Sequence, residues 1–94
     1  MEKTKRAFSY HWGSGVVAEQ AQVQGEHHVP TIQLLRFDEG PAAGEKSIRF
    51  CSYSLRGRFQ RSPLLMSPGE IEQMREALKE TPELRSLILR LVMD

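Results

Sequence analysis

The residues best suited to chemistry in this chain lie in residues 46–61, which read KSIRFCSYSLRGRFQR. Five side chains of this run are basic, three are aromatic and none is acidic. The segments on either side each sum to −2, so the net charge of +1 conceals a local charge of +5. Clustered cations interleaved with flat rings suit a phosphate backbone with exposed bases. The run therefore indicates binding of nucleic acid rather than catalysis.

Other reactive side chains are scattered along the chain. His27 and His28 fall in a predicted turn, His11 lies far from them in sequence, and a metal site needs several converging ligands. Cys51 has no histidine near it that could act as a base. The carboxylates of the C-terminal third recur at a four-residue spacing, which is typical of a solvated helix face. We expect no enzyme activity, no metal site and no cofactor.

Length and composition predict a small globular protein. The 94 residues suffice for one domain, and 39% hydrophobic with 27% charged residues is typical of a soluble chain. No apolar run approaches the roughly 18 residues that span a membrane. The start, MEKTKR, lacks the apolar stretch of a secretory signal, and the single cysteine cannot form an internal disulfide. We expect a cytoplasmic location and no membrane partner.

Four stretches have the composition of β-strands: residues 16–24, 31–37, 46–55 and 58–66. Arg56 and Gly57 predict the turn between the last two. A proline inside the fourth stretch indicates an edge strand or a bulge, because proline donates no ladder hydrogen bond. The sequence therefore predicts a four-stranded antiparallel meander.

An aromatic segment precedes these strands. Phe8, Tyr10 and Trp12 alternate and would share one face of an extended segment, and Gly13-Ser14-Gly15 then predicts a hinge. Two interpretations remain open, a short edge strand and a partly ordered arm. For the domain organisation, we expect residues 1–15 to form a partly flexible arm and residues 16–94 a single domain.

The C-terminal third has the signals of helices. Ser67 as N-cap, Pro68 at the first position and Glu70 form a capping box. Thr81 followed by Pro82 restarts or kinks the helix. The fold class is therefore α+β, with the meander followed by one kinked helix or two short helices.

The last helical segment is apolar over more than one stripe. Its main face is expected to form a homodimer interface, since one sheet face cannot easily cover so wide an arc. The alternative is simple packing against the sheet. The predicted interface residues are Leu84, Leu87, Ile88 and Leu91.

Strand alternation divides the basic run between two faces. Arg49 and Tyr53 would share one face and Ile48 and Phe50 the other, so we expect the second pair to be buried and the first to reach solvent or ligand. Phe59 and Arg61 would point with Arg49. A solvated edge strand is the alternative, because excess cations also keep edges from pairing. The predicted nucleic-acid surface comprises Arg49, Tyr53, Arg56, Arg58, Phe59 and Arg61.

The order of four strands and a helix resembles the PC4-like fold of the transcriptional coactivator p15 family. The resemblance covers residues 46–91, with IRF in one strand, RFQR in the next and a helix start at Ser67. It implies a curved sheet that binds single-stranded DNA and a helix that forms a homodimer. The chain departs from the family in having Arg61-Ser62-Pro63 before the helix and no tryptophan near the helix start.

These patterns together predict sequence-tolerant, salt-dependent binding of single-stranded DNA or RNA, connected with transcription. The alternative is a small protein-interaction module that docks through its apolar C-terminal helix, with its basic patch facing an acidic partner.

Overall fold

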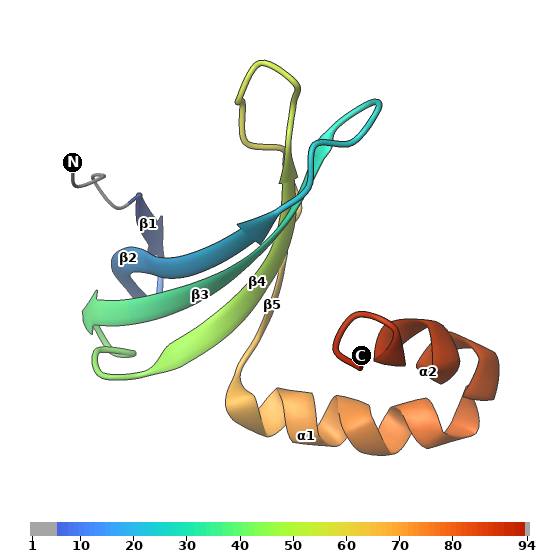
Figure 1. The fold of residues 1–94 in the computed structure, drawn as a ribbon. Helices are drawn as coiled ribbons and strands as arrows, with labels where there is room; N and C mark the ends of the chain where they lie inside the picture. The colour runs from blue at the N-terminus through green and yellow to red at the C-terminus, as the bar shows by residue number, and fades with distance from the viewer. Residues whose placement is uncertain (1–5, 94) are drawn as a thin grey trace.

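A computed structural model describes residues 6–93, and these form a curled sheet followed by a pair of helices (Figure 1). The strands form one antiparallel sheet in the order β1-β2-β3-β4-β5. The α+β class and the meander are confirmed, but the sheet has five strands rather than four. The elements are β1 (Ala7–Tyr10), β2 (Gly13–Gln22), β3 (Val29–Glu39), β4 (Lys46–Tyr53), β5 (Leu64–Met66), α1 (Pro68–Ala77), the 3-10 turn η1 (Leu78–Glu80) and α2 (Pro82–Leu89).

The additional strand is β1, the aromatic segment near the N-terminus. Its residues Phe8 and Tyr10 pair with Gly15 and Gly13 of β2, so the edge strand is the correct one of the two interpretations. The glycines are not a hinge, because a Cβ atom at Gly15 would overlap the carbonyl oxygen of Arg36 in β3. Residues 6–15 thus belong to the sheet rather than to a separate arm, and residues 1–5 lie outside the described part.

The fourth predicted strand is mostly a loop. The chain turns where Arg56 and Gly57 predicted it, and Tyr53 pairs with Phe59 in a single bridge. Ser62 then adopts a φ of 63°, a left-handed conformation that residues other than glycine seldom take. Pro63 follows and has no N–H to donate. Regular pairing with β4 resumes only over β5.

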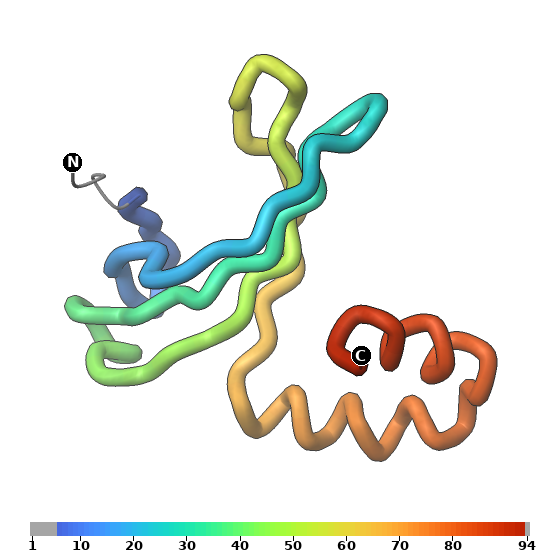
Figure 2. Tube along the Cα trace, in the orientation of Figure 1, coloured from blue at the N-terminus to red at the C-terminus, as the bar shows by residue number. Residues whose placement is uncertain are grey.

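The sheet curls around an apolar core on its inner face. That core consists of Phe8, Val17, Leu35 and Phe37, closed by Ala42 from the loop between β3 and β4. The rings of Phe8 and Phe37 meet edge to face at 4.9 Å. The Cα trace in Figure 2 shows the central strands twisting together. Their outer face has no residue of this core and carries exposed apolar side chains such as Ile32.

The helices project away from the sheet (Figures 1 and 2). The predicted capping box begins α1: Ser67 Oγ accepts from the Glu70 N–H, and Glu70 accepts from the Ser67 N–H. The helical segment is divided into α1 and α2 before Pro82, as predicted. No residue of either helix is buried, and α2 approaches no strand. Within residues 6–93, no helix is long and apolar enough to cross a membrane.

Candidate nucleic-acid interface

The inner face of the sheet has an apolar half and a polar half, and β3 contributes to both. Leu35 and Phe37 belong to the apolar core, whereas Thr31 and Gln33, on the same face, are polar and equally buried. Across from Gln33 and Thr31, β4 places Arg49 and Cys51. A strand whose side chains alternate between buried and exposed can therefore carry buried polar residues inside the curl of the sheet.

Gln33 is the centre of a hydrogen-bond network in the polar half. Its Oε1 accepts from Nε of Arg49 at 2.7 Å, and its Nε2 donates to Gln20 Oε1 and to the Tyr53 hydroxyl, both at 3.0 Å. Nη1 of Arg49 donates to the Tyr10 hydroxyl at 2.9 Å. Four strands thus share one network, which holds the Arg49 guanidinium in a fixed position.

Aromatic rings and cations pack together beside this network. The guanidinium carbon of Arg49 lies 4.7 Å from the ring centroid of Phe59, and that of Arg6 lies 4.2 Å from the Tyr53 ring. The Tyr53 and Phe59 rings meet edge to face at 5.4 Å. Such contacts between a cation and a ring face are attractive. We call Arg6, Arg49, Tyr53 and Phe59 the arginine–aromatic cluster.

The turn after β4 brings further arginines to the same end of the sheet. Ser54 Oγ accepts from the backbone N–H groups of Arg56 at 3.3 Å and of Arg58 at 3.0 Å. Gly57, with a φ of 90°, supplies the left-handed residue that the turn requires. A shallow hollow is lined by Ser54, Arg56, Gly57 and Arg58. We call residues 54–61 the basic turn, and its three arginines are all exposed.

These arginines have no acidic partner in the structure of residues 6–93. Three ion pairs are present there. One joins Glu26 to His27 in a hairpin, and the other two each join a glutamate to a cation on the helices. No carboxylate among residues 6–93 therefore neutralises the positive charge at this end of the sheet. A surface with unopposed cations attracts anions over several ångströms. The arginines concerned are Arg6, Arg49, Arg56, Arg58 and Arg61.

The predicted exposure of two site residues is wrong. Arg49 and Tyr53 are each only 5% exposed, whereas Ile48 and Phe50 are half-buried on the outer face. The physical reason is the direction of the curl, which closes the sheet over the face that carries Arg49. The predicted grouping of Arg49, Tyr53 and Phe59 on one face is nevertheless confirmed by their ring contacts.

Phe59 and the turn arginines remain accessible. Phe59 is 38% exposed, and Arg56, Arg58 and Arg61 are exposed. Sequence reasoning missed Arg6, which lies outside the basic run and reaches the site only because β1 joins the sheet. It also missed Gln33, although a glutamine among alternating apolar residues of a strand is a signal of a buried polar group.

Cys51 lies half-buried within the polar half. Burial raises the pKa of its thiol, while the positive charge and a hydrogen bond of Arg49, and the charge of Arg6, act in the opposite direction. Its Sγ lies 3.4 Å from Oε1 of Gln33 and can donate to it. The thiol is therefore protonated at neutral pH and is a poor nucleophile. Across residues 6–93, no three His, Cys, Asp or Glu side chains gather as a metal site.

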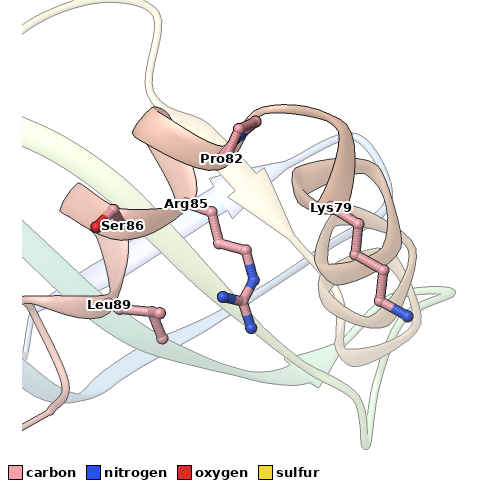
Figure 3. Close-up of a pocket in the computed structure, with 5 residues that line it drawn as sticks. All are labelled: Lys79, Pro82, Arg85, Ser86 and Leu89. Atoms are coloured by element: carbon pink, nitrogen blue, oxygen red, sulfur yellow. The ribbon is translucent and has the colours of Figure 1, made fainter.

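A second hollow lies on the helices, away from the sheet. It has a volume of about 370 Å³ and is formed by η1 and α2 (Figure 3). Lys79 of its rim is bonded to Glu76 at 3.0 Å. Its lining contains one hydroxyl and two cationic side chains but neither a histidine nor a carboxylate. The lining residues are Lys79, Pro82, Arg85, Ser86 and Leu89.

The residues predicted to form a dimer interface are all at the surface. Between 42% and 65% of each side chain is exposed, and neighbouring Val92 and Met93 are exposed as well. The alternative of simple packing against the sheet is not realised, because α2 approaches only η1. The four residues are Leu84, Leu87, Ile88 and Leu91.

Comparison of the chain with protein-family models, with curated proteins and with solved structures finds no match. The resemblance to the PC4-like fold therefore stays a prediction.

Proposed function

We propose that the protein binds single-stranded nucleic acid at the end of the sheet formed by the arginine–aromatic cluster and the basic turn. One observation carries this proposal: two arginines lie against two aromatic rings, three more follow in the adjoining basic turn, and none of the five has a carboxylate partner among residues 6–93. Phosphate groups would supply the missing negative charge and release counterions. Unstacked bases would supply flat surfaces for the exposed ring of Phe59.

The residues of the proposed site have different roles, which follow from their exposure. Arg56, Arg58 and Arg61 are free to follow a phosphate backbone, and Phe59 is partly exposed beside them. Arg6 covers the Tyr53 ring and is itself exposed, so a base could take its place. Contacts of this kind recognise charge and flat rings rather than base edges, which favours sequence-tolerant binding.

Fluorescence anisotropy with a labelled single-stranded oligonucleotide, at low and moderate salt, tests this function. We expect Arg58→Glu/Arg61→Glu to weaken binding at least about tenfold at low salt and to flatten the salt dependence, because each lost phosphate contact removes about 0.7 from the slope. The matched control is Arg85→Glu/Arg90→Glu, which makes the same charge change in α2 and at its C-cap. Absence of wild-type binding at low salt would refute the function. Equal weakening by the control would refute the site.

A specific observation supports self-association as a second function. The helix pair buries no residue, yet its last turns carry a continuous set of exposed apolar side chains. A helix with a wide apolar arc requires cover, either from its own sheet or from a partner. Its own sheet does not supply that cover.

The size of the uncovered surface agrees with a second copy as the partner. The chain exposes 7705 Å², whereas a compact monomer of this mass exposes about 5,500 Å². The excess of about 2,000 Å² is enough for a stable interface, which needs about 800 Å² from each partner. The radius of gyration, 14.8 Å, likewise exceeds the roughly 12 Å of a compact domain of this length. We therefore propose a homodimer formed through the helices.

Size-exclusion chromatography with light scattering tests the dimer. We expect wild type to elute as a dimer at micromolar concentration and Leu87→Glu as a monomer with unchanged sheet signal in circular dichroism. Ser86→Glu is the matched control, since it places the same charge on the neighbouring exposed position. A monomeric wild type would refute self-association and leave a different protein partner as the occupant.

A further inference from the structure

Arg49 differs from the other arginines of the site because it is buried. Only 5% of it is exposed, while the arginines of the basic turn lie in solvent. A buried charge is unfavourable unless an opposite charge or several hydrogen bonds compensate it. Arg49 has hydrogen bonds to Gln33 and Tyr10 and also interacts with the thiol of Cys51, but all three of these groups are neutral. Its positive charge therefore remains uncompensated within residues 6–93.

The remaining free edge of the guanidinium is defined by these contacts. Nε and Nη1 are engaged with Gln33 and Tyr10, and the Phe59 ring covers one face at 4.7 Å. Among residues 6–93, Nη2 makes no hydrogen bond to an oxygen atom. Every fully buried side-chain nitrogen or oxygen there has a hydrogen-bond partner, and Arg49 keeps 5% of its surface exposed. The free donors point along one edge, in the plane of the group.

We infer that this edge of Arg49 binds a single phosphate group of the bound strand, an inference that rests on the proposed function. Planar N–H donors match the oxygens of phosphate, and a charge-assisted bond to a fixed donor is stronger than one to a mobile donor. Arg6, which lies against Tyr53 in the same cluster, adds a second positive charge. The network around Gln33 orients the donor before the ligand arrives, so little ordering is needed on binding.

The inference assigns different roles to the two kinds of arginine. The exposed arginines of the basic turn attract the backbone as a diffuse charge. Arg49 holds one phosphate at a fixed point beside Phe59, so that the adjoining base is placed against the ring. The nucleic acid is thereby held with one phosphate at a fixed position, whatever its base sequence.

Nuclear magnetic resonance of the arginine side-chain nitrogens tests the site in the full-length wild-type protein. Oligothymidylate of about 8 nucleotides, within the usual site size of sheet-type binders, is titrated in one arm, and inorganic phosphate in another. We expect the Arg49 Nη signals to shift with the oligonucleotide and to saturate with the affinity measured by anisotropy. A shift with inorganic phosphate but none with the oligonucleotide would overturn the assignment to a strand phosphate.

Arg49→Lys provides the second readout, since it keeps the charge but loses the planar donor edge. We expect binding to weaken about tenfold while the salt slope stays nearly unchanged, unlike the charge reversal in the basic turn. Unchanged Arg49 signals on a wild type that binds the oligonucleotide would overturn the inference and leave the proposed function intact. Failure of wild type to bind any oligonucleotide would instead refute the proposed function. Because the resonance experiment uses wild type, a variant that fails to fold does not weaken the test.

Discussion

The sheet and the helix pair are stabilised in opposite ways. The sheet encloses an apolar core and a polar network, and all its fully buried side-chain polar atoms are hydrogen-bonded. The helices have a well-formed capping box and local ion pairs, but no buried residue. Local signals are enough to specify a helix, whereas most helical stability in proteins comes from packing of an apolar face. The sheet can thus fold by its own contacts, whereas the helices would gain packing only from the second copy of the proposed dimer.

The two regions should differ most in the unfolding free energy that is lost when one leucine in each is replaced by alanine. Leu35 is fully buried in the core, so Leu35→Ala should cost about 2–5 kcal/mol of unfolding free energy. Leu87 is 55% exposed, so Leu87→Ala should change the free energy of a dilute monomer by less than about 0.5 kcal/mol. Urea unfolding at low protein concentration measures both. Equal losses would mean that the helices share the core of the sheet.

A smaller loss is expected from the polar half of the sheet. Tyr10→Phe keeps the ring stacked at 4.9 Å on Trp12 but leaves an Arg49 donor without its acceptor. The expected cost is about 1.5–3 kcal/mol, since a hydrogen bond to a charged group is lost. Ser9→Ala, an exposed change on the same strand, serves as the control in the same urea series. No loss in Tyr10→Phe would show that the network contributes nothing to sheet stability.

The helix pair should respond to the loss of its cap without affecting the sheet. Ser67→Ala removes the acceptor of the Glu70 N–H and should destabilise α1 by about 1 kcal/mol. Hydrogen exchange resolved by residue should show faster exchange in the first turn of α1 and no change in β2 and β3. Faster exchange throughout the sheet would contradict the independence of the two regions.

The smallest effect concerns the pH dependence of the sheet. Burial raises the pKa of Cys51, so the folded protein keeps a proton that the unfolded chain loses near its ordinary value of 9.0. Stability from this group is complete below that pH and falls as the pH rises above it. Unfolding by urea between about pH 7 and 10 should therefore show a shallower decline for Cys51→Ala than for wild type. Parallel curves would mean that the thiol titrates alike in both states.

The features that the sequence predicted well are local. Ser67, Pro68 and Glu70 identify the helix start, and Arg56-Gly57 identifies the turn, because caps and turns depend on neighbouring residues. The direction of the curl could not be predicted in this way. It depends on β1 reaching the inner face, where Tyr10 meets Arg49 across 39 positions of sequence. The sequence therefore predicted correctly which residues of β4 share a face, but it predicted the wrong face to be buried.

Within residues 6–93, the two regions are joined by the short β5 and the capped start of α1, and α1 contacts both β4 and β5. In the proposed dimer, the two-fold axis would pass through the helices, so that the two basic ends occupy fixed positions in space. A single-stranded nucleic acid long enough to reach the basic ends of both subunits would bind with avidity, because its second contact would be intramolecular. The angle between β5 and α1 at Ser67 would then set the shortest nucleic acid that can reach both basic ends. The binding affinity would rise in a step at that length.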